Sequence, residues 1–365
     1  FINSTITGNK VAGIGATMAN IVITGGTINF IDNCYIANNN KMTAFIGGTS
    51  STINIIGNNI FTNQTGVGSA GENMTIIGNN TFTNLNSIGG ANYLLINGTN
   101  KFYNSTDPNG RNILTASKYG LINGENIFEN IGAFISGGNI TINGSNIFNN
   151  TGNANHALNT AFIVATNILI NGSNKFTNHA QSSVGGGVYI NNNLGYLNIM
   201  GENLFENITT SAIIKHTNPT DDGTTTPKLN VTGTYFINNN MIGASNGENG
   251  IFYLGGGTRP GNSTISNNYF INNTFTGNST LIKIYHRITA SGKLCPYNIT
   301  IQNNIIDGIN AEDGGAILIN EVEGVPSVVK IINNTFKNIR SNNETINLPK
   351  LVDTTITNNT YENCT

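Results

Sequence analysis

The chain has 365 residues, of which only 9% are charged, and its formal charge is −2 at pH 7. So few lysine and arginine residues cannot concentrate positive charge against phosphates, which argues against nucleic acid as a partner. About a fifth of the residues are Asn, 44 are Gly and none is Trp. Asn and Gly tolerate positive φ angles, so the composition suits a fold with many tight turns.

The cysteines and the hydropathy exclude two further classes of protein. Cys34, Cys295 and Cys364 lie far apart and are odd in number, so they form neither a disulfide framework nor a zinc motif. We interpret them as buried small side chains or isolated thiols. No apolar run approaches the roughly 18 residues of a membrane helix, and we expect no signal peptide within these residues. Because the first residue is Phe1, we expect a piece of a longer or processed chain.

One short unit recurs along the chain. Residues 139–150 read Asn-Ile-Thr-Ile-Asn-Gly-Ser-Asn-Ile-Phe-Asn-Asn, and close variants occupy 73–84 and 167–178. The Ile-Thr-Ile alternation is the pattern of a half-buried strand. The Gly that follows marks a turn, and Phe148 begins a second short strand. A third apolar patch comes later in many units, such as residues 161–164 and 251–254.

The aromatic residue of each unit serves as its marker. In chain order the markers are Phe1, Phe30, Phe61, Phe82, Phe102, Phe128, Phe148, Phe176, Phe205, Phe236 and Phe270, followed by Ile306, Phe336 and Tyr361. The shortest interval is 20 residues, from Phe82 to Phe102 and again from Phe128 to Phe148, and the other intervals exceed it by variable amounts. A coil with a minimum length per turn and loops at tolerant corners has this spacing.

These features predict an all-β fold. We expect one domain over residues 1–365, a right-handed parallel β-helix (a solenoid) of about 13 rungs with three short strands in each rung. A leucine-rich repeat lacks its Leu-x-x-Leu-x-Leu frame here, and a propeller blade needs about 40 residues. A left-handed β-helix would keep a strict hexapeptide rhythm, which is absent.

The recurrent Asn and Phe residues are predicted to be structural. Asn at a corner can adopt the left-handed conformation, and its amide can pair with the Asn of the next rung, while the Phe series would stack inside. Up to Phe205 the turn Gly lies four residues before the aromatic, whereas Gly233 lies three before Phe236, and later units have an Asn pair. We therefore expect a change of corner geometry near residues 225–240.

The repeats resemble those of two groups of surface proteins. Asn-Asn-Thr-Phe, at 79–82 and 333–336, resembles the repeats of adhesin-like β-helix proteins of methanogenic archaea. Gly-Gly-Ala-Ile at 314–317 and Phe-Lys-Asn at 336–338 also resemble the repeats of chlamydial polymorphic membrane proteins. The resemblance covers nearly the whole chain and concerns the style of the repeat. It implies a large, secreted cell-surface protein with an adhesive role.

Residues that could carry catalysis are few. Hydrolases of this architecture need two carboxylates at a defined separation. The candidate carboxylates are Asp221, Asp222, Glu312, Asp313, Glu321 and Glu323. They are accompanied by no Gly-His-Gly or Arg-x-Lys signature of polygalacturonases, and the first two lie in a segment that is typical of a solvated loop. The four His residues are scattered. We expect no catalytic residue, no cofactor and no metal.

The third apolar patches of the second half predict a binding face. If Val188, Ile190, Ile214, Phe252, Leu254, Ile282 and Ile284 point inward, strand alternation places the intervening residues outward. Those candidates are Tyr189, Lys215, Tyr253, Lys283 and Tyr285, with Arg287 and Glu321 near the edge. Aromatic rings offer flat apolar area with a polar tip, which suits a glycan. Ordinary strand formers on a wet face are the alternative interpretation.

Asn-x-Ser/Thr sequons are abundant in this chain. If the protein is exported, exposed sequons are candidates for glycosylation. We select Asn104, Asn207, Asn262 and Asn278. A sequon at a tight corner, such as Asn143, is a poor candidate, because an amide buried in a ladder cannot carry a sugar.

These observations predict a non-catalytic cell-surface adhesin, or a subunit of an extracellular filament or sheath, that binds glycans or a cell-surface protein through an outer face. Open strand edges at both ends invite self-association end to end. The alternative is a carbohydrate-active β-helix, such as a polysaccharide lyase, a glycosidase or a viral tailspike. A carboxylate pair or a Lys/Arg trio in one groove, together with depolymerisation, would distinguish it.

Overall fold

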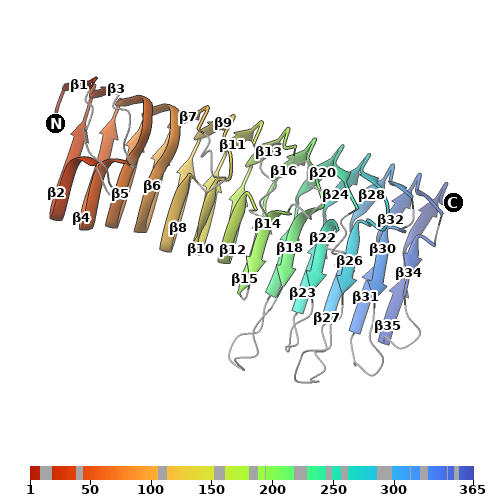
Figure 1. Ribbon diagram of the computed structural model, residues 1–365. Helices are drawn as coiled ribbons and strands as arrows, with labels where there is room; N and C mark the ends of the chain where they lie inside the picture. The colour runs from red at the N-terminus through yellow and green to blue at the C-terminus, as the bar shows by residue number, and fades with distance from the viewer. Residues whose placement is uncertain are drawn as a thin grey trace. The chain divides into compact units, whose positions relative to one another are not determined.

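The computed structural model describes residues 1–8, 19–37, 44–105, 113–151, 161–180, 188–193, 195–217, 228–243, 249–255, 262–285, 298–312, 314–320, 328–342, 344–348 and 353–365. Across these residues the chain is all-β, and it forms two compact units, unit 1 (Phe1–Ile163) and unit 2 (Val164–Thr365). In each unit the chain coils so that every strand pairs in parallel with its counterpart in the next rung (Figure 1). The predicted parallel β-helix is confirmed.

Each rung, that is, each turn of the coiled chain, contributes strand residues to three parallel faces, which we call walls A, B and C. Wall A contains the strands with the alternating apolar pair, such as Ile140 and Ile142. Wall B contains the short strands with the aromatic marker, and wall C contains the strands of the third apolar patch. Each wall therefore gathers one position of the repeat from successive rungs.

In unit 1 the strands of walls C and A are continuous (Figure 1). These long strands are β2 (Ala19–Ile31), β4 (Ala44–Gly57), β5 (Ile60–Gly78), β6 (Thr81–Gly98), β8 (Leu114–Gly124) and β10 (Ile135–Gly144). The register shifts inside them, for example between Ala91 and Tyr93 where β6 pairs with β8. A bulge of this kind bends a strand and increases its twist, so one strand can serve two walls.

Wall B of unit 1 consists of short strands and of the first residues of β5 and β6. The short strands are β1 (Thr5–Thr7), β3 (Tyr35–Ala37), β7 (Lys101–Tyr103), β9 (Ile127–Glu129) and β11 (Ile147–Asn149).

In unit 2 the three walls have mostly separate strands. Wall A contains β12 (Ile163–Gly172), which begins with wall C residues, and β15 (Tyr196–Met200), β19 (Lys228–Thr232), β23 (Asn262–Ser266), β27 (Asn298–Gln302), β31 (Val328–Ile332) and β35 (Asp353–Thr357). Wall B contains β13 (Lys175–Thr177), β16 (Leu204–Glu206), β20 (Tyr235–Ile237), β24 (Tyr269–Ile271), β28 (Ile305–Asp307), β32 (Thr335–Lys337) and β36 (Thr360–Glu362). Wall C contains β14 (Val188–Asn193), β18 (Ala212–Thr217), β22 (Gly250–Gly255), β26 (Ile282–Tyr285), β30 (Ile317–Asn320) and β34 (Ile346–Asn347).

Unit 2 also has a narrow sheet of two-residue strands just after wall B. It is made of β17 (Thr209–Thr210), β21 (Asn240–Met241), β25 (Thr274–Phe275), β29 (Asn310–Ala311) and β33 (Arg340–Ser341).

The aromatic markers of wall B stack inside each unit. In unit 1 the ring centroids of Phe82 and Phe102 lie 4.8 Å apart, and those of Phe102 and Phe128 lie 4.5 Å apart, with nearly parallel planes. In unit 2 the Phe176 and Phe205 rings lie 4.7 Å apart. These separations match the strand spacing of about 4.8 Å, so in-register pairing of the rungs dictates the stacking. The predicted column of Phe residues is confirmed.

Two of the aromatic markers, Phe1 and Phe30, lie in wall A and not in wall B. Phe30 pairs with Ile55 in wall A, and Phe1 stacks on Phe30 with ring centroids 5.2 Å apart. The wall B position of these rungs is filled by Ile6 and Ile36, since Ile36 pairs with Phe61. An aromatic ring fits the inner position of either wall, so the sequence spacing alone misplaced the first two rungs.

A ladder of buried Asn residues runs beside the Phe column. Its members in unit 1 lie two residues before each wall B aromatic and are at most 1% exposed: Asn59, Asn80, Asn100, Asn126 and Asn146. The main-chain N–H and the Nδ2 of Asn80 both donate to Asn100 Oδ1, at 3.1 and 2.9 Å. Nδ2 of Asn80 also donates to the Ile77 carbonyl at 2.9 Å. Each side chain thereby satisfies buried polar groups of two rungs.

A column of glycines forms the corner before this ladder in unit 1. Gly57, Gly78, Gly98, Gly124 and Gly144 have φ between +94° and +113°. A Cβ on Gly98 would lie 2.5 Å from the carbonyl oxygen of Gly78. The left-handed backbone and the close approach of the preceding rung therefore both require glycine.

The corner of unit 2 changes along the chain. Gly201, four residues before Phe205, has φ +89°, whereas Gly233 and Asn267, three residues before their markers, have φ +70° and +56°. Nδ2 of Asn203 donates to the carbonyl of Met200 in its own rung at 2.6 Å. Nδ2 of Asn268 donates instead to the Val231 carbonyl of the preceding rung at 3.0 Å. At this shorter corner the Nδ2 of Asn268 thus bonds a carbonyl of the preceding rung, where Nδ2 of Asn203 bonds one of its own rung.

Replacing a ladder residue will leave several buried groups without partners. We expect Asn100→Ala to lower the free energy of unfolding by about 2–4 kcal/mol, because Asn80 and Asn126 both lose hydrogen bonds to it. Urea unfolding followed by circular dichroism measures this. The matched control is Asn79→Ala at an exposed position, with an expected change within about 0.5 kcal/mol. Equal effects of the two substitutions would contradict the structural role of the ladder.

The glycine corner gives a second test of the stacking. We expect Gly98→Ala to destabilise unit 1 by about 2 kcal/mol or more, because the added methyl group meets the Gly78 carbonyl and the residue stays at φ +109°. The control is Thr99→Ala, which trims an exposed side chain at the next position. A Gly98→Ala protein with an unchanged urea midpoint would show that the corner is more open than described.

Candidate functional site

The predicted binding face on wall C of unit 2 is largely buried. The residues predicted to point inward are confirmed as buried: Val188, Ile190, Ile214, Phe252, Leu254, Ile282 and Ile284. The prediction that the intervening residues face solvent is wrong for Tyr189, Tyr253 and Lys283, which are 0%, 6% and 4% exposed. Lys215 is half-buried. The side chain of Tyr285, and all of Arg287 and Glu321, lie outside the described residues.

Tyr189 is buried because strand alternation does not hold at the start of wall C. Its ring lies 4.5 Å from the His179 ring and meets the rings of Phe176 and Phe205 edge to face, at 6.1 and 6.4 Å. In the two following rungs, residues 212–214 and 250–252 are likewise buried at three consecutive positions. The chain enters wall C from a corner here, so side chains on both faces of the strand are buried at these positions.

The next row of wall C runs through Asn191, Lys215, Tyr253 and Lys283, which pair in register. Nζ of Lys283 donates to Oδ1 of Asn249 at 2.8 Å, and Asn249 is 1% exposed. The amine therefore turns back along the neighbouring strand instead of reaching water. Burial lowers the pKa of the Lys283 ammonium. Tyr253 and Lys283 are buried in this row, and Asn191 and Lys215 are half-buried, so the row is not the open platform that alternation predicts.

A second buried polar pair lies one position further along wall C. Nδ1 of His216 and Oδ1 of Asn192 are 2.6 Å apart, and Nδ2 of Asn192 donates to the carbonyl of Thr166 at 2.7 Å. His216 is only 6% exposed, and burial lowers its pKa from 6.5 to about 4. The imidazole is therefore neutral at pH 7 and serves as a structural hydrogen-bond partner of the Asn192 amide.

The outer face of wall B in unit 2 carries apolar side chains that are accessible to solvent. Six outward side chains, which we call the apolar strip, lie on four consecutive strands of this wall: Leu204, Tyr235, Ile237, Tyr269, Ile271 and Ile305. All are half-buried or exposed, and Tyr269 and Ile305 reach 36% and 38% exposure. The rings of Tyr235 and Tyr269 stack with centroids 4.7 Å apart. The strip is a regular ridge with one or two apolar side chains per rung.

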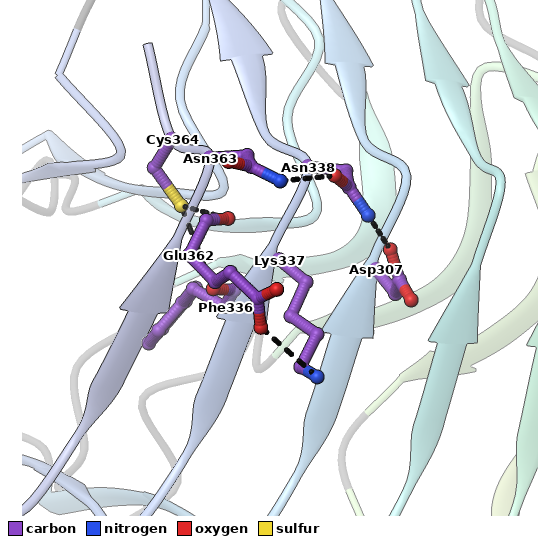
Figure 2. A network of polar contacts seen from close by, with 7 residues as sticks. All are labelled: Asp307, Phe336, Lys337, Asn338, Glu362, Asn363 and Cys364. Carbon is purple, nitrogen blue, oxygen red and sulfur yellow. Dashed lines mark hydrogen bonds and ion pairs between the residues drawn. The ribbon is translucent and has the colours of Figure 1, made fainter.

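Beyond the last strand of the apolar strip, the outward side chains of wall B are polar or charged. Figure 2 shows the rungs that follow it toward the C-terminus, where Lys337 and Glu362 form an ion pair at 3.1 Å. Nδ2 of Asn363 donates to Asn338 Oδ1 at 3.2 Å, and Nδ2 of Asn338 donates to Asp307 Oδ1 at 2.7 Å. Charges thus border the strip on this side. A solvent-exposed ion pair of this kind adds little stability.

Sequence reasoning missed the apolar strip although its signal was present. The strip residues come directly before or after the wall B markers, in Leu-Phe-Glu, Tyr-Phe-Ile, Tyr-Phe-Ile and Ile-Ile-Asp. Residues on both sides of a buried strand position point outward. Aligning the repeats on the marker would therefore have shown apolar residues on the outer face of four successive rungs.

The remaining candidate residues give no reactive cluster in the described part. Glu312 is exposed and accepts a hydrogen bond from the Gly277 N–H at 2.7 Å, while Asp221, Asp222, Asp313, Glu321 and Glu323 lie outside that part. Among the described residues no group of three His, Cys, Asp or Glu side chains is placed to hold a metal ion. The described residues also contain no helix that is long and apolar enough to span a membrane.

The two described cysteines are free thiols. Cys34 is 1% exposed and occupies the first position of the Asn ladder, where its N–H donates to Asn59 Oδ1 at 3.1 Å. Cys364 is a half-buried free thiol, and Cys295 lies outside the described residues.

The four selected sequon residues, Asn104, Asn207, Asn262 and Asn278, are all exposed. Glycosylation at these positions stays a prediction.

Comparison of the chain with protein-family models, with curated proteins and with solved structures gives no match.

The buried His216 makes stability depend on pH with a defined sign. In the unfolded chain it binds a proton below pH 6.5, whereas in the folded protein it stays neutral down to about pH 4. Stability should therefore fall as the pH drops between these values, by up to about 1.4 kcal/mol per pH unit. We expect His216→Gln to remove this contribution. Urea unfolding at pH 7, 6 and 5 compares the two proteins, and parallel pH profiles would contradict the burial of a neutral imidazole.

Proposed function

We propose that this chain is a non-catalytic extracellular protein, an adhesin or a subunit of a filament or sheath, that makes contact through the apolar strip on wall B. The observation that carries the proposal is the strip itself, in which Tyr and Ile side chains are held in rows on a rigid sheet. A contiguous apolar surface of this kind, bordered by polar residues, is typical of a contact site.

The chemistry of the strip suits a polysaccharide or another extended, regular surface. Tyr235 and Tyr269 are stacked on the outer face, and a tyrosine offers apolar ring area together with a hydrogen-bonding hydroxyl group. Glu206 and Asp307 lie beside the strip on its first and last strands. Carboxylates at the border can accept hydrogen bonds from sugar hydroxyl groups.

The scaffold supports the same function. Each rung pairs with its neighbours, and the buried ladders leave the outer residues of the walls free to vary without loss of the fold. A repeat architecture of this type is suited to presenting one long surface, and fold-level analogy alone does not decide what that surface binds.

The test uses the purified chain and its Tyr235→Ser/Tyr269→Ser variant. We expect the chain either to be retained on immobilised polysaccharides, as an adhesin, or to self-associate in sedimentation, as a filament subunit. We expect the variant to weaken that contact at least about tenfold. The matched control is Tyr35→Ser/Tyr196→Ser, which removes two tyrosines that are also exposed but lie on other strands. Absence of both kinds of binding, or equal losses in variant and control, would overturn the proposal.

The carbohydrate-active alternative has a different signature in the same assay. A lyase or glycosidase would release oligosaccharides or reducing ends from the polysaccharide, whereas an adhesin retains the polymer unchanged. Release of products by the wild-type chain would replace our proposal with the alternative.

A further inference from the structure

The contact between Lys283 and Asn249 joins two neighbouring rungs of unit 2. Lys283 lies in β26, and Asn249 immediately precedes β22, the strand with which β26 pairs. Nζ and Oδ1 lie 2.8 Å apart, and the two residues are 4% and 1% exposed. An amine and a primary amide are thus held together where water has little access.

This amine has an unusual environment for a lysine. A buried ammonium is normally paired with a carboxylate, because an unpaired charge is costly to bury. Within the described residues Nζ of Lys283 makes its hydrogen bond to the side-chain amide of Asn249, which is neutral. Burial lowers the pKa of Lys283 and so favours the uncharged amine. The neutral amine carries the lone pair that makes lysine a nucleophile.

The geometry places the amide carbon near this nucleophile. Cγ of Asn249 is one C=O bond, about 1.2 Å, behind Oδ1, so Nζ stands no further than about 4 Å from Cγ. Reacting atoms in well-oriented pairs approach to about 3–3.5 Å, and a small side-chain rotation covers the difference. Two groups fixed on paired strands meet continuously, which replaces a bimolecular encounter by an intramolecular one.

We propose that Lys283 and Asn249 become joined by an intramolecular isopeptide bond. Nζ attacks Cγ, an Nζ–Cγ bond forms, and the Cγ–Nδ2 bond breaks. One proton of the amine moves to the leaving nitrogen, which departs as ammonia, and the second proton stays on the new amide. The reaction needs no oxidant, metal or cofactor, and the product is a secondary amide between rungs.

The bond would change the energetics of this part of unit 2. It converts a buried amine, whose charged form is disfavoured, into a neutral amide that has an ordinary donor and acceptor. It also closes a covalent loop across two rungs, which restricts the unfolded chain as a disulfide does. Such a cross-link suits a chain with few charged residues and no disulfide between its described cysteines, and it does not depend on what the apolar strip binds.

The test is the mass of the native chain. Loss of one ammonia lowers the intact mass by about 17 Da, and a protease digest should contain a branched peptide that links Lys283 to Asn249. A native chain of unmodified mass, without the branched peptide, overturns the proposal.

Two variants separate this bond from other reactions of asparagine. Asn249 precedes Gly250, so its side chain can also lose ammonia by closing on its own backbone as a succinimide, with the same change of mass. Lys283→Met leaves Asn249 intact and should abolish the loss of about 17 Da, whereas Lys215→Met, in the same row of wall C, should keep it. Persistence of the loss in Lys283→Met would assign it to the succinimide and overturn the isopeptide bond. Circular dichroism checks that each variant folds.

Discussion

The buried Asn ladder is the interaction on which the rest of each unit depends. Inside a β-helix the chain must turn a corner between walls A and B, and the turning backbone exposes N–H groups that water cannot reach. Where two ladder Asn residues are neighbours, Oδ1 of one accepts two hydrogen bonds from the preceding rung, as Asn126 Oδ1 does from the N–H and Nδ2 of Asn100 at 3.1 and 2.9 Å. An unsatisfied donor at this depth would cost more than the bond contributes, so the ladder sets the register of the rungs.

Once the register is set, each position of the repeat becomes a column. Phe stacks on Phe, and the corner glycine of unit 1 lies against the carbonyl of the glycine in the preceding rung. The inner columns tolerate few residue types, since their neighbours are identical and close. The outer columns are free of this constraint, and there the chain of unit 2 places Tyr and Ile on successive strands of wall B.

Wall C of unit 2 follows a different physical rule from the ladder. The ladder amides are neutral, repeated and fully paired, and they stabilise a corner. The buried groups of wall C occur once each, and they include an imidazole and an amine whose charged forms are disfavoured by burial. Groups of this kind define functional or chemical sites more often than ladders do, because their reactivity is altered by the place they occupy.

The sequence alone determined the repeat, the strand alternation, the Phe column and the parallel β-helix, because these depend on spacings that local chemistry fixes. It did not determine which wall receives Phe1 and Phe30, since a ring fits either inner position. Only the tertiary structure decided that Tyr189 and Lys283 are buried. Alternation predicts faces only within a regular strand. At a corner, and between rungs 34 residues apart such as those of Asn249 and Lys283, packing decides which side chains meet.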